Sequence, residues 1–265
     1  PDLPQMVRMV EHGFGLSEAS NMPVILELRI RACHVRGSFE AQDNVAPRIS
    51  TRALMHEPAS FDYNKLAHPP VTFRHEKLKS DQRIPAARRY ILEHGLNESM
   101  PGTQGDLGLI VQGGLYNALI RSLQQLGLAN AFGESDIPIL VLNVTYPLVP
   151  DQIVEFCVGK RAVMVLEEGQ PEYIEQDIAT TLRRRNIQTP LHGKDWLSNA
   201  GEYSVEVIAN GLCRFAETYL PTAGLASAQT WLTGNQQRRT AIAQQLPQAL
   251  PARPPGFCIG CPERP

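Results

Sequence analysis

The stretch LGLIVQGGLYNALIRSLQQLGL, residues 107–128, decides the fold. It begins with a short apolar run that ends at Gly113 and Gly114, and it continues with apolar residues repeated at helical spacing. This pattern predicts a buried strand joined to an amphipathic helix by a tight turn. Such a strand–helix unit is the building block of an α/β protein.

Two further units of the same kind follow along the chain. The strand IPILVLNV (137–144) precedes the helix DQIVEFCV (151–158), and Pro150 and Asp151 suit a helix start. The strand RAVMVLEE (161–168) precedes GQPEYIEQDIATTLRRRNI (169–187), whose acidic first turns and closing Arg183–Arg185 suit the helix dipole. A last helix is expected over 202–220. Residues 105–220 are therefore predicted to form an α/β domain, a parallel sheet flanked by helices.

The sequence on either side of this domain is less regular. Residues 1–40 read as one helix, followed by a strand over 24–30 whose apolar and polar residues alternate. One helix and one strand cannot close a core. Residues 41–104 are rich in Pro, His and Arg and read as a long connector, with one clear helix at about 85–95. Residues 221–252 read as a second connector, with a helix around 235–246.

Composition excludes several classes of protein. The 265 residues carry 25 basic and 27 acidic side chains, so a formal charge of −2 gives no reason to expect nucleic acid or a membrane as partner. No apolar run approaches the roughly 18 residues that cross a bilayer, and the N-terminus has no signal-peptide core. Cys33, Cys157 and Cys213 stand singly in apolar stretches, as expected of free thiols in the reducing cytoplasm. The chain opens without Met inside a predicted helix, which suggests a fragment.

Two motifs lie at predicted strand ends of the α/β domain. The turn VQGGLYNAL (111–119) is either a phosphate-binding turn or a plain tight turn, because it matches no established nucleotide fingerprint. Glu167 and Glu168 lie at the carboxyl end of the strand of the third unit, where open α/β sheets hold ligands. Successive strand residues point to opposite faces, so a structural or interface role is favoured over an acid/base pair. Arg183–Arg185 are most simply a solvated helix end.

Two more motifs lie outside that domain. In RIRACHVRG (29–37), Arg29, Arg31 and His34 either bind a carboxylate or form a solvent-facing strand end. Cys258 and Cys261 form a CxxC close to the end of the chain. Half of a metal site, a redox dithiol and the opening of a further domain all fit this spacing. No second pair of ligands accompanies it in the sequence.

Taken in order, these pieces resemble one family. The Arg-x-x-His turn, GLIVQGGLYNAL, PLVPDQIVEF, VLEEGQPEYIEQDI and RPPGFCIGCPERP follow one another as in indolepyruvate ferredoxin oxidoreductase, in its fused bacterial form. This is a thiamine-diphosphate-dependent 2-oxoacid:ferredoxin oxidoreductase. The resemblance runs over nearly all 265 residues.

The resemblance implies a division of the chain. Residues 1–40 would be the end of a pyrimidine-binding domain, 105–220 a transketolase C-terminal-like domain, and 253–265 the start of a diphosphate-binding domain. Residues 41–104 and 221–252 would connect them. The chain would then be mainly scaffold and interface within a cytoplasmic homodimer.

The resemblance also implies the chemistry of the parent enzyme. It would bind thiamine diphosphate, magnesium and 4Fe-4S clusters, and convert an aryl 2-oxoacid and CoA to an acyl-CoA with ferredoxin as electron acceptor. Arg31 and His34 match the turn near the substrate pocket, whereas Cys258 and Cys261 would line the cofactor entrance. Glu263 stands where the family usually has His. The thiamine-activating Glu and the magnesium-binding motif would lie outside this chain, so no cofactor is expected on it alone.

Two other functions remain open from the sequence. One is a free-standing α/β module that binds an anionic small ligand, such as a nucleotide or CoA, at Gly113 and Gly114. The other is a zinc-containing interaction domain built on Cys258 and Cys261.

Overall fold

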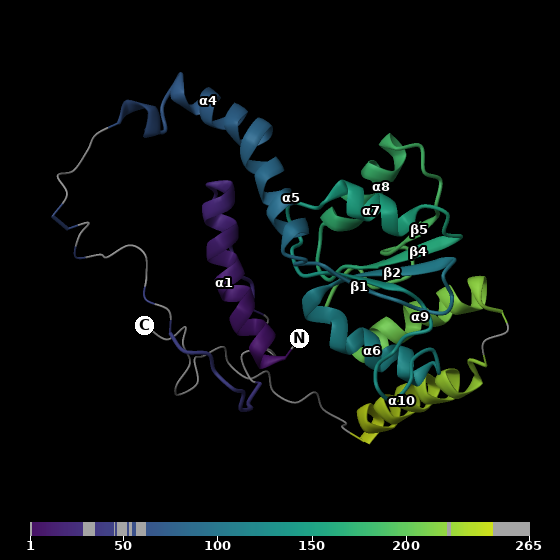
Figure 1. Cartoon of the computed structure of the whole chain (residues 1–265). Coiled ribbons are helices and arrows are strands. Elements are labelled where there is room, and N and C mark those ends of the chain that lie inside the picture. The colour runs from purple at the N-terminus through teal and green to yellow at the C-terminus, as the bar shows by residue number, and fades with distance from the viewer. Residues whose placement is uncertain are drawn as a thin grey trace.

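A five-stranded sheet forms the centre of the molecule (Figure 1). The computed structural model describes residues 2–28, 35–44, 46, 52, 55–56, 62–221 and 224–245. The strands are β1 (Glu98–Met100), β2 (Leu107–Gln112), β3 (Ile139–Leu142), β4 (Ala162–Leu166) and β5 (Leu191–His192). They lie in the order β1-β3-β2-β4-β5.

Four of these strands are parallel, as the alternation of strands and helices predicts. β2 pairs with β3 on one side, where Ile110 lies opposite Leu140, and with β4 on the other, where Ile110 lies opposite Val165. β5 adds to β4 in parallel. Only β1 runs antiparallel, along the outer edge of β3. The predicted α/β class, a parallel sheet flanked by helices, is confirmed.

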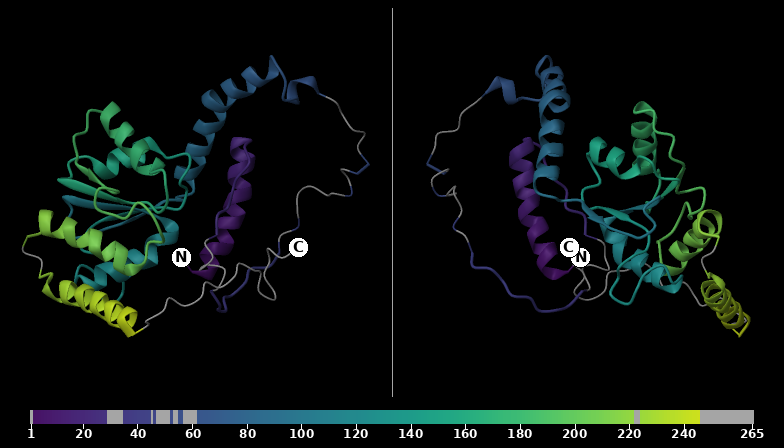
Figure 2. Two further views of the ribbon diagram at one scale, coloured as in Figure 1. Left: turned by 180° about the vertical axis from the view of Figure 1, so that it is seen from behind. Right: turned by 45° about the vertical axis from the view of Figure 1, so that its right-hand side comes forward.

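Helices cover both faces of the sheet because the strand residues are apolar on both sides. α6 (Tyr116–Gln125) and α9 (Val205–Tyr219) cover one face, and α7 (Pro150–Cys157) and α8 (Tyr173–Arg184) cover the other (Figures 1 and 2). Leu109, Val111 and Met164 pack toward α6 and α9. Ile110, Leu140 and Val165 pack toward α7 and α8. Burial of both strand faces supplies the main stabilisation of this domain.

A long helical rod extends away from the sheet. It consists of α4 (Val71–Leu78), the π-helical turn Lys79–Arg83 and α5 (Ile84–Glu93). The shorter helix predicted over about 85–95 is the last part of this rod. α1 (Leu3–Ser20) lies beside α5 in both views of Figure 2. A small separate core holds the two helices together; it contains Leu16, Ala87, Ile91, Leu96 and Val149.

The strand predicted over 24–30 is wrong for its described part. Residues 23–28 belong to no strand, and Ile25 and Leu28 are exposed by 93% and 52%. A strand exists only when a neighbour satisfies its backbone hydrogen bonds. The described residues provide no such neighbour for this segment. Its alternating pattern is therefore not sufficient for a strand.

The regions predicted as connectors contain more structure than the sequence indicates. Residues 41–104 include α4, a short 3-10 turn at Tyr63–Lys65, and β1, which joins the sheet. After residue 220, α10 (Ala226–Gln245) begins about ten residues before the helix expected around 235–246. It lies beyond α9 (Figure 1), and Arg239 forms an ion pair with Glu206 of α9. None of the helices in the described ranges has the length and apolarity of a membrane span.

Candidate functional site

The carboxyl ends of β2 and β4 meet where the connections of the sheet reverse direction. β2 is followed in sequence by β3 on one side, and the chain then crosses to β4 on the other. Open α/β sheets commonly bind ligands in the crevice at such a point. Here Gln112 Oε1 accepts a hydrogen bond of 2.9 Å from the amide of Glu168, so the two strand ends are tied together.

Glu167 caps the start of α8. Its side chain is 5% exposed, and its two carboxylate oxygens accept hydrogen bonds of 3.0 Å from the amides of Ile174 and Glu175. A carboxylate on the first amides of a helix satisfies their hydrogen-bonding capacity and the helix dipole. These contacts favour the structural interpretation of Glu167 over a role as an acid or base.

Glu168 holds the loop that precedes α9. Its Oε2 accepts a 2.6 Å hydrogen bond from the amide of Tyr203, whose side chain is buried. The Tyr203 hydroxyl donates to the carbonyl of Ser198 at 2.7 Å and accepts from Lys194 Nζ at 2.8 Å. The Lys194 ammonium also lies 4.7 Å from the centre of the Tyr203 ring. Burial and the nearby carboxylates raise the pKa of Tyr203.

Glu175 completes this network on the other side of Lys194. It accepts a 3.0 Å hydrogen bond from the amide of Lys194, and it packs where Gly193 has no side chain. Burial raises the pKa of Glu175. Burial likewise lowers the pKa of Lys194, and the surrounding carboxylates oppose that change. The network therefore joins α8 to the 193–203 loop.

Close packing against the end of β3 explains the glycine at position 113, in the turn after β2. A Cβ on Gly113 would collide with Asn143 Oδ1 at the end of β3. Asn143 Nδ2 donates to the carbonyl of Leu96 at 2.9 Å and to Glu98 Oε1 at 2.7 Å. Gly113 thus lets a side chain of a neighbouring strand approach the backbone. The close approach of an anionic ligand is not needed to explain it.

A histidine cluster lies at the end of β5. His192 Nδ1 is 2.8 Å from Asp195 Oδ2, and Nε2 is 2.8 Å from the Tyr219 hydroxyl. The ring stacks on Trp196 with centroids 3.6 Å apart. Burial acts to raise the pKa of Asp195, but hydrogen bonds from His192 and Gly193 outweigh it and lower that pKa. Sequence reasoning missed this cluster, because the sequence shows only an Asp three residues after a His.

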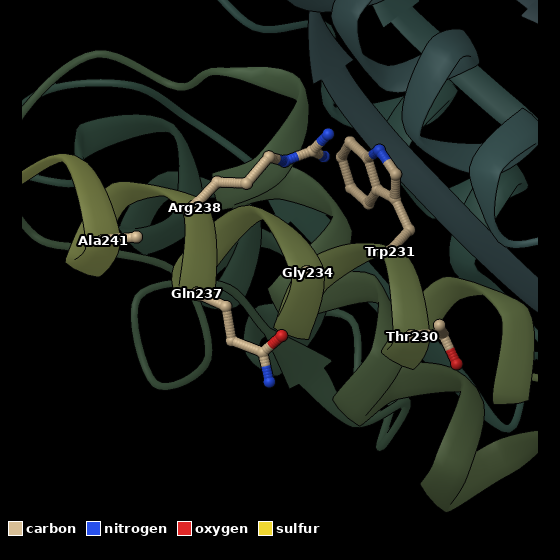
Figure 3. Close-up of a pocket in the computed structure, with 6 residues that line it drawn as sticks. All are labelled: Thr230, Trp231, Gly234, Gln237, Arg238 and Ala241. Atoms are coloured by element: carbon tan, nitrogen blue, oxygen red, sulfur yellow. The ribbon is translucent and has the colours of Figure 1, made fainter.

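Two surface hollows among the described residues are shallow, and neither lies at the carboxyl ends of β2 and β4. One, of about 510 Å³, runs along α10 between Thr230 and Ala241. Figure 3 shows the Arg238 guanidinium reaching toward the Trp231 indole on that helix. All of its lining residues belong to α10, so no second element encloses a ligand there. A smaller hollow of about 330 Å³ lies beside Trp196 and Arg214.

The four residues predicted to bind substrate or cofactor lie outside the described ranges. These are Arg31, His34, Cys258 and Cys261, and Glu263 lies outside them as well. Their roles stay predictions. Cys157 and Cys213 are buried free thiols, and burial raises the pKa of Cys157 to about 12. Within the described ranges, no group of three or more His, Cys, Asp or Glu side chains is arranged to hold a metal ion.

Sequence comparison confirms the family resemblance. No family model matches the chain. Its curated relatives include indolepyruvate oxidoreductase subunit IorA of Methanothermobacter marburgensis, which is 29% identical over 100% of this chain and 38% of the relative. The subunits of Methanothermobacter thermautotrophicus (26%; 99% and 38%) and Thermococcus kodakarensis (23%; 97% and 36%) match similarly. The chain thus spans less than two fifths of the length of these relatives.

Solved structures give more distant likenesses. A 2-oxoglutarate:ferredoxin oxidoreductase from Magnetococcus marinus matches 75% of this chain and 29% of its own, with a TM-score of 0.37 and 16% identity. A split-gene transketolase matches 45% of this chain and 41% of its own, with a TM-score of 0.35 and 14% identity.

Proposed function

We propose that this chain is an interior segment of a thiamine-diphosphate-dependent 2-oxoacid:ferredoxin oxidoreductase of the indolepyruvate type. The parent enzyme oxidatively decarboxylates an aryl 2-oxoacid, passes the electrons through iron–sulfur clusters to ferredoxin and forms an acyl-CoA. The observation that carries this proposal is sequence similarity to IorA subunits over 97–100% of the chain. The share of 36–38% of the relatives' length supports the assignment as a segment.

Within that enzyme, the α/β domain acts mainly as a scaffold. Its carboxylates Glu167 and Glu168, which follow β4, and Glu175, in α8, accept hydrogen bonds from backbone amides of the same domain. Each of these bonds fixes a helix start or a loop. A network that holds elements in place within the domain supports the scaffold role. We propose that this scaffold organises neighbouring cofactor domains in a homodimer.

The described residues do not fit a site for thiamine diphosphate and magnesium. Magnesium at a diphosphate is usually held by one or two protein carboxylates together with the phosphates. The carboxylates at the end of β4 and the start of α8, Glu167, Glu168 and Glu175, already accept hydrogen bonds from backbone amides. In the parent enzyme such a cofactor would supply the electron sink for decarboxylation. We assign its ligands to the rest of the parent enzyme and no chemical step to the residues described here.

Arg31 and His34 are proposed to hold the 2-oxoacid. The planar guanidinium of Arg matches a carboxylate in two-point contact, and His supplies a second polar group three residues later. Cys258 and Cys261 are proposed to line the entrance to the cofactor.

Activity of the full-length protein tests the proposal. We expect the anaerobically purified protein, with any subunit that co-purifies, to reduce ferredoxin when given indolepyruvate, CoA and thiamine diphosphate. Omission of CoA or of thiamine diphosphate should abolish the reaction. The 265-residue chain alone should be inactive. Failure of the full-length protein to oxidise any aryl 2-oxoacid would refute the proposal, as would turnover by the 265-residue chain.

A further inference from the structure

The smaller of the two surface hollows lies between two elements, the loop that follows β5 and the helix α9. The loop supplies Asp195–Ser198, and the helix supplies Val207, Asn210 and Arg214. Residues three and four apart lie on one face of a helix, so these three side chains form a continuous wall. The volume of about 330 Å³ is at the lower end of the range for small-molecule sites. It therefore has room for one ring system rather than for a large cofactor.

The half-buried Trp196 indole gives this hollow an aromatic wall that is fixed in place. It stacks on the His192 ring with the centroids 3.6 Å apart and the planes 8° from parallel, and the Phe215 ring meets it edge-on with the centroids 6.0 Å apart. His192 is itself held by hydrogen-bonding contacts with Asp195 and Tyr219. An indole that is already ordered loses little rotamer freedom when a flat ring packs against it.

Arg214 is the charged group of the hollow that is left to meet a ligand. The other side chains with polar oxygen or amide groups that line it, Asp195, Ser198 and Asn210, form hydrogen bonds within the chain, and both carboxylate oxygens of Asp195 are among the acceptors. The exposed Arg214 guanidinium forms no hydrogen bond or ion pair with another described residue. A guanidinium matches a carboxylate or a phosphate in two-point contact.

We propose that this hollow binds a planar aromatic ring that carries an anionic group. Trp196 packs against the ring, and Arg214 holds the carboxylate or phosphate. Aromatic carboxylates and nucleoside monophosphates share this chemistry. Because the hollow is shallow and encloses a ligand between two elements only, we expect dissociation constants in the submillimolar to millimolar range. The inference does not depend on the proposed function.

The chain contains a matched comparison for this site. Its second tryptophan, Trp231, also lines a hollow, and the Arg238 guanidinium reaches toward it (Figure 3). All lining residues there belong to α10, and Arg238 donates a hydrogen bond to Asn235 on the same helix. Both places therefore have an indole and a guanidinium, but Trp196 has a second enclosing element and an arginine without such a partner. We expect binding at Trp196 and not at Trp231.

A titration followed by NMR distinguishes the two places. The chain has only two tryptophans, so the isotope-labelled 265-residue chain gives one indole N–H signal for Trp196 and one for Trp231. The probes are indole-3-acetate and AMP, and their uncharged analogues are tryptophol and adenosine. We expect at least one of the two anions to shift the Trp196 signal saturably and to leave the Trp231 signal in place. The anion that binds more tightly identifies the class of ligand.

Arg214→Gln tests the contact with the anionic group. Loss of a charge-assisted hydrogen bond should weaken binding of the charged probe about tenfold or more, and should leave the weak binding of its uncharged analogue unchanged. Arg184→Gln removes an exposed arginine from the end of α8 and is the matched control. This control should bind the probe as the wild type does.

Four results would each overturn the proposal. The first is a Trp196 signal that neither anion shifts at concentrations up to about 10 mM. The second is a shift of the Trp231 signal alone. The third is equal affinity for a charged probe and its uncharged analogue, and the fourth is equal affinity of Arg214→Gln and the wild type for the charged probe.

Discussion

Two apolar segments of this molecule differ in structure: one is a buried strand and the other is an exposed segment that forms no strand. In β2, Ile110 is fully buried between two neighbouring strands and the helices above them. In the segment after α1, Ile25 is 93% exposed and its neighbours form no strand. Both stretches carry the residues that strands prefer. An apolar pattern therefore forms a strand only where a neighbouring strand can pair with its backbone. Within the α/β domain, the strands pair with one another.

A matched pair of isoleucine substitutions should show this difference most strongly. Ile110→Ala leaves a cavity in a close-packed core and should lower the free energy of unfolding by about 2–5 kcal/mol. Ile25→Ala should change it by less than about 0.5 kcal/mol. Urea denaturation of the 265-residue chain measures both. Equal losses would mean that residues 24–28 are packed as tightly as β2.

Removal of the carboxylate at the start of α8 should have the next largest effect. Glu167→Ala leaves the buried amide of Ile174 and the half-buried amide of Glu175 without their acceptor. We expect a loss of about 1–2 kcal/mol in the free energy of unfolding. The exposed Glu155→Ala is the control and should cost almost nothing. If the two variants lose the same stability, Glu167 does not hold the helix start.

The buried thiol of Cys157 should make the domain sensitive to alkaline pH. An ordinary thiol loses its proton near its reference pKa of 9.0, whereas burial raises the pKa of folded Cys157 to about 12. The unfolded state thus binds fewer protons between these values, so stability falls as pH rises from about 9, by at most about 1.4 kcal/mol per pH unit. Cys157→Ala should reduce this slope in denaturation curves. An identical slope in the variant would show that the thiol titrates normally.

The smallest effect is expected on the outer face of α1. Phe14 is 73% exposed, so Phe14→Ala should change the stability of the 265-residue chain by less than about 0.5 kcal/mol. In the full-length protein, the same substitution should cost more, because the proposed pyrimidine-binding domain would cover this face. Thermal denaturation of both forms makes the comparison. An equally small effect in the full-length protein would argue against burial of Phe14 by the proposed pyrimidine-binding domain.

The sequence predicts the α/β domain well because each of its long strands is a continuous apolar run next to an amphipathic helix. It does not predict β5, because Leu191 and His192 form a strand of only two residues. The rod before β1 is longer than expected because its π-helical turn at Lys79–Arg83 shifts the helical period. α10 begins before the helix that the sequence predicts around 235–246, because its first turns carry small and polar residues without apolar spacing.

The candidate site is less predictable than the fold. Position at a strand end singled out Glu167 and Glu168, but their partners depend on how α8 and the 193–203 loop pack. Lys194 and Tyr203 meet only through that packing. His192 and Tyr219 are 27 residues apart, and no local pattern reveals such a pair. Contacts between distant residues are set by the tertiary fold.

Native-state hydrogen exchange of the 265-residue chain, resolved by residue, tests the central claim most directly. A self-sufficient α/β scaffold predicts that the amides of 109–111, 139–142 and 162–166 exchange only through global unfolding, while those of 24–28 exchange nearly as fast as an unfolded peptide. Protection of 24–28 equal to that of the sheet would contradict the account, as would free exchange in the sheet.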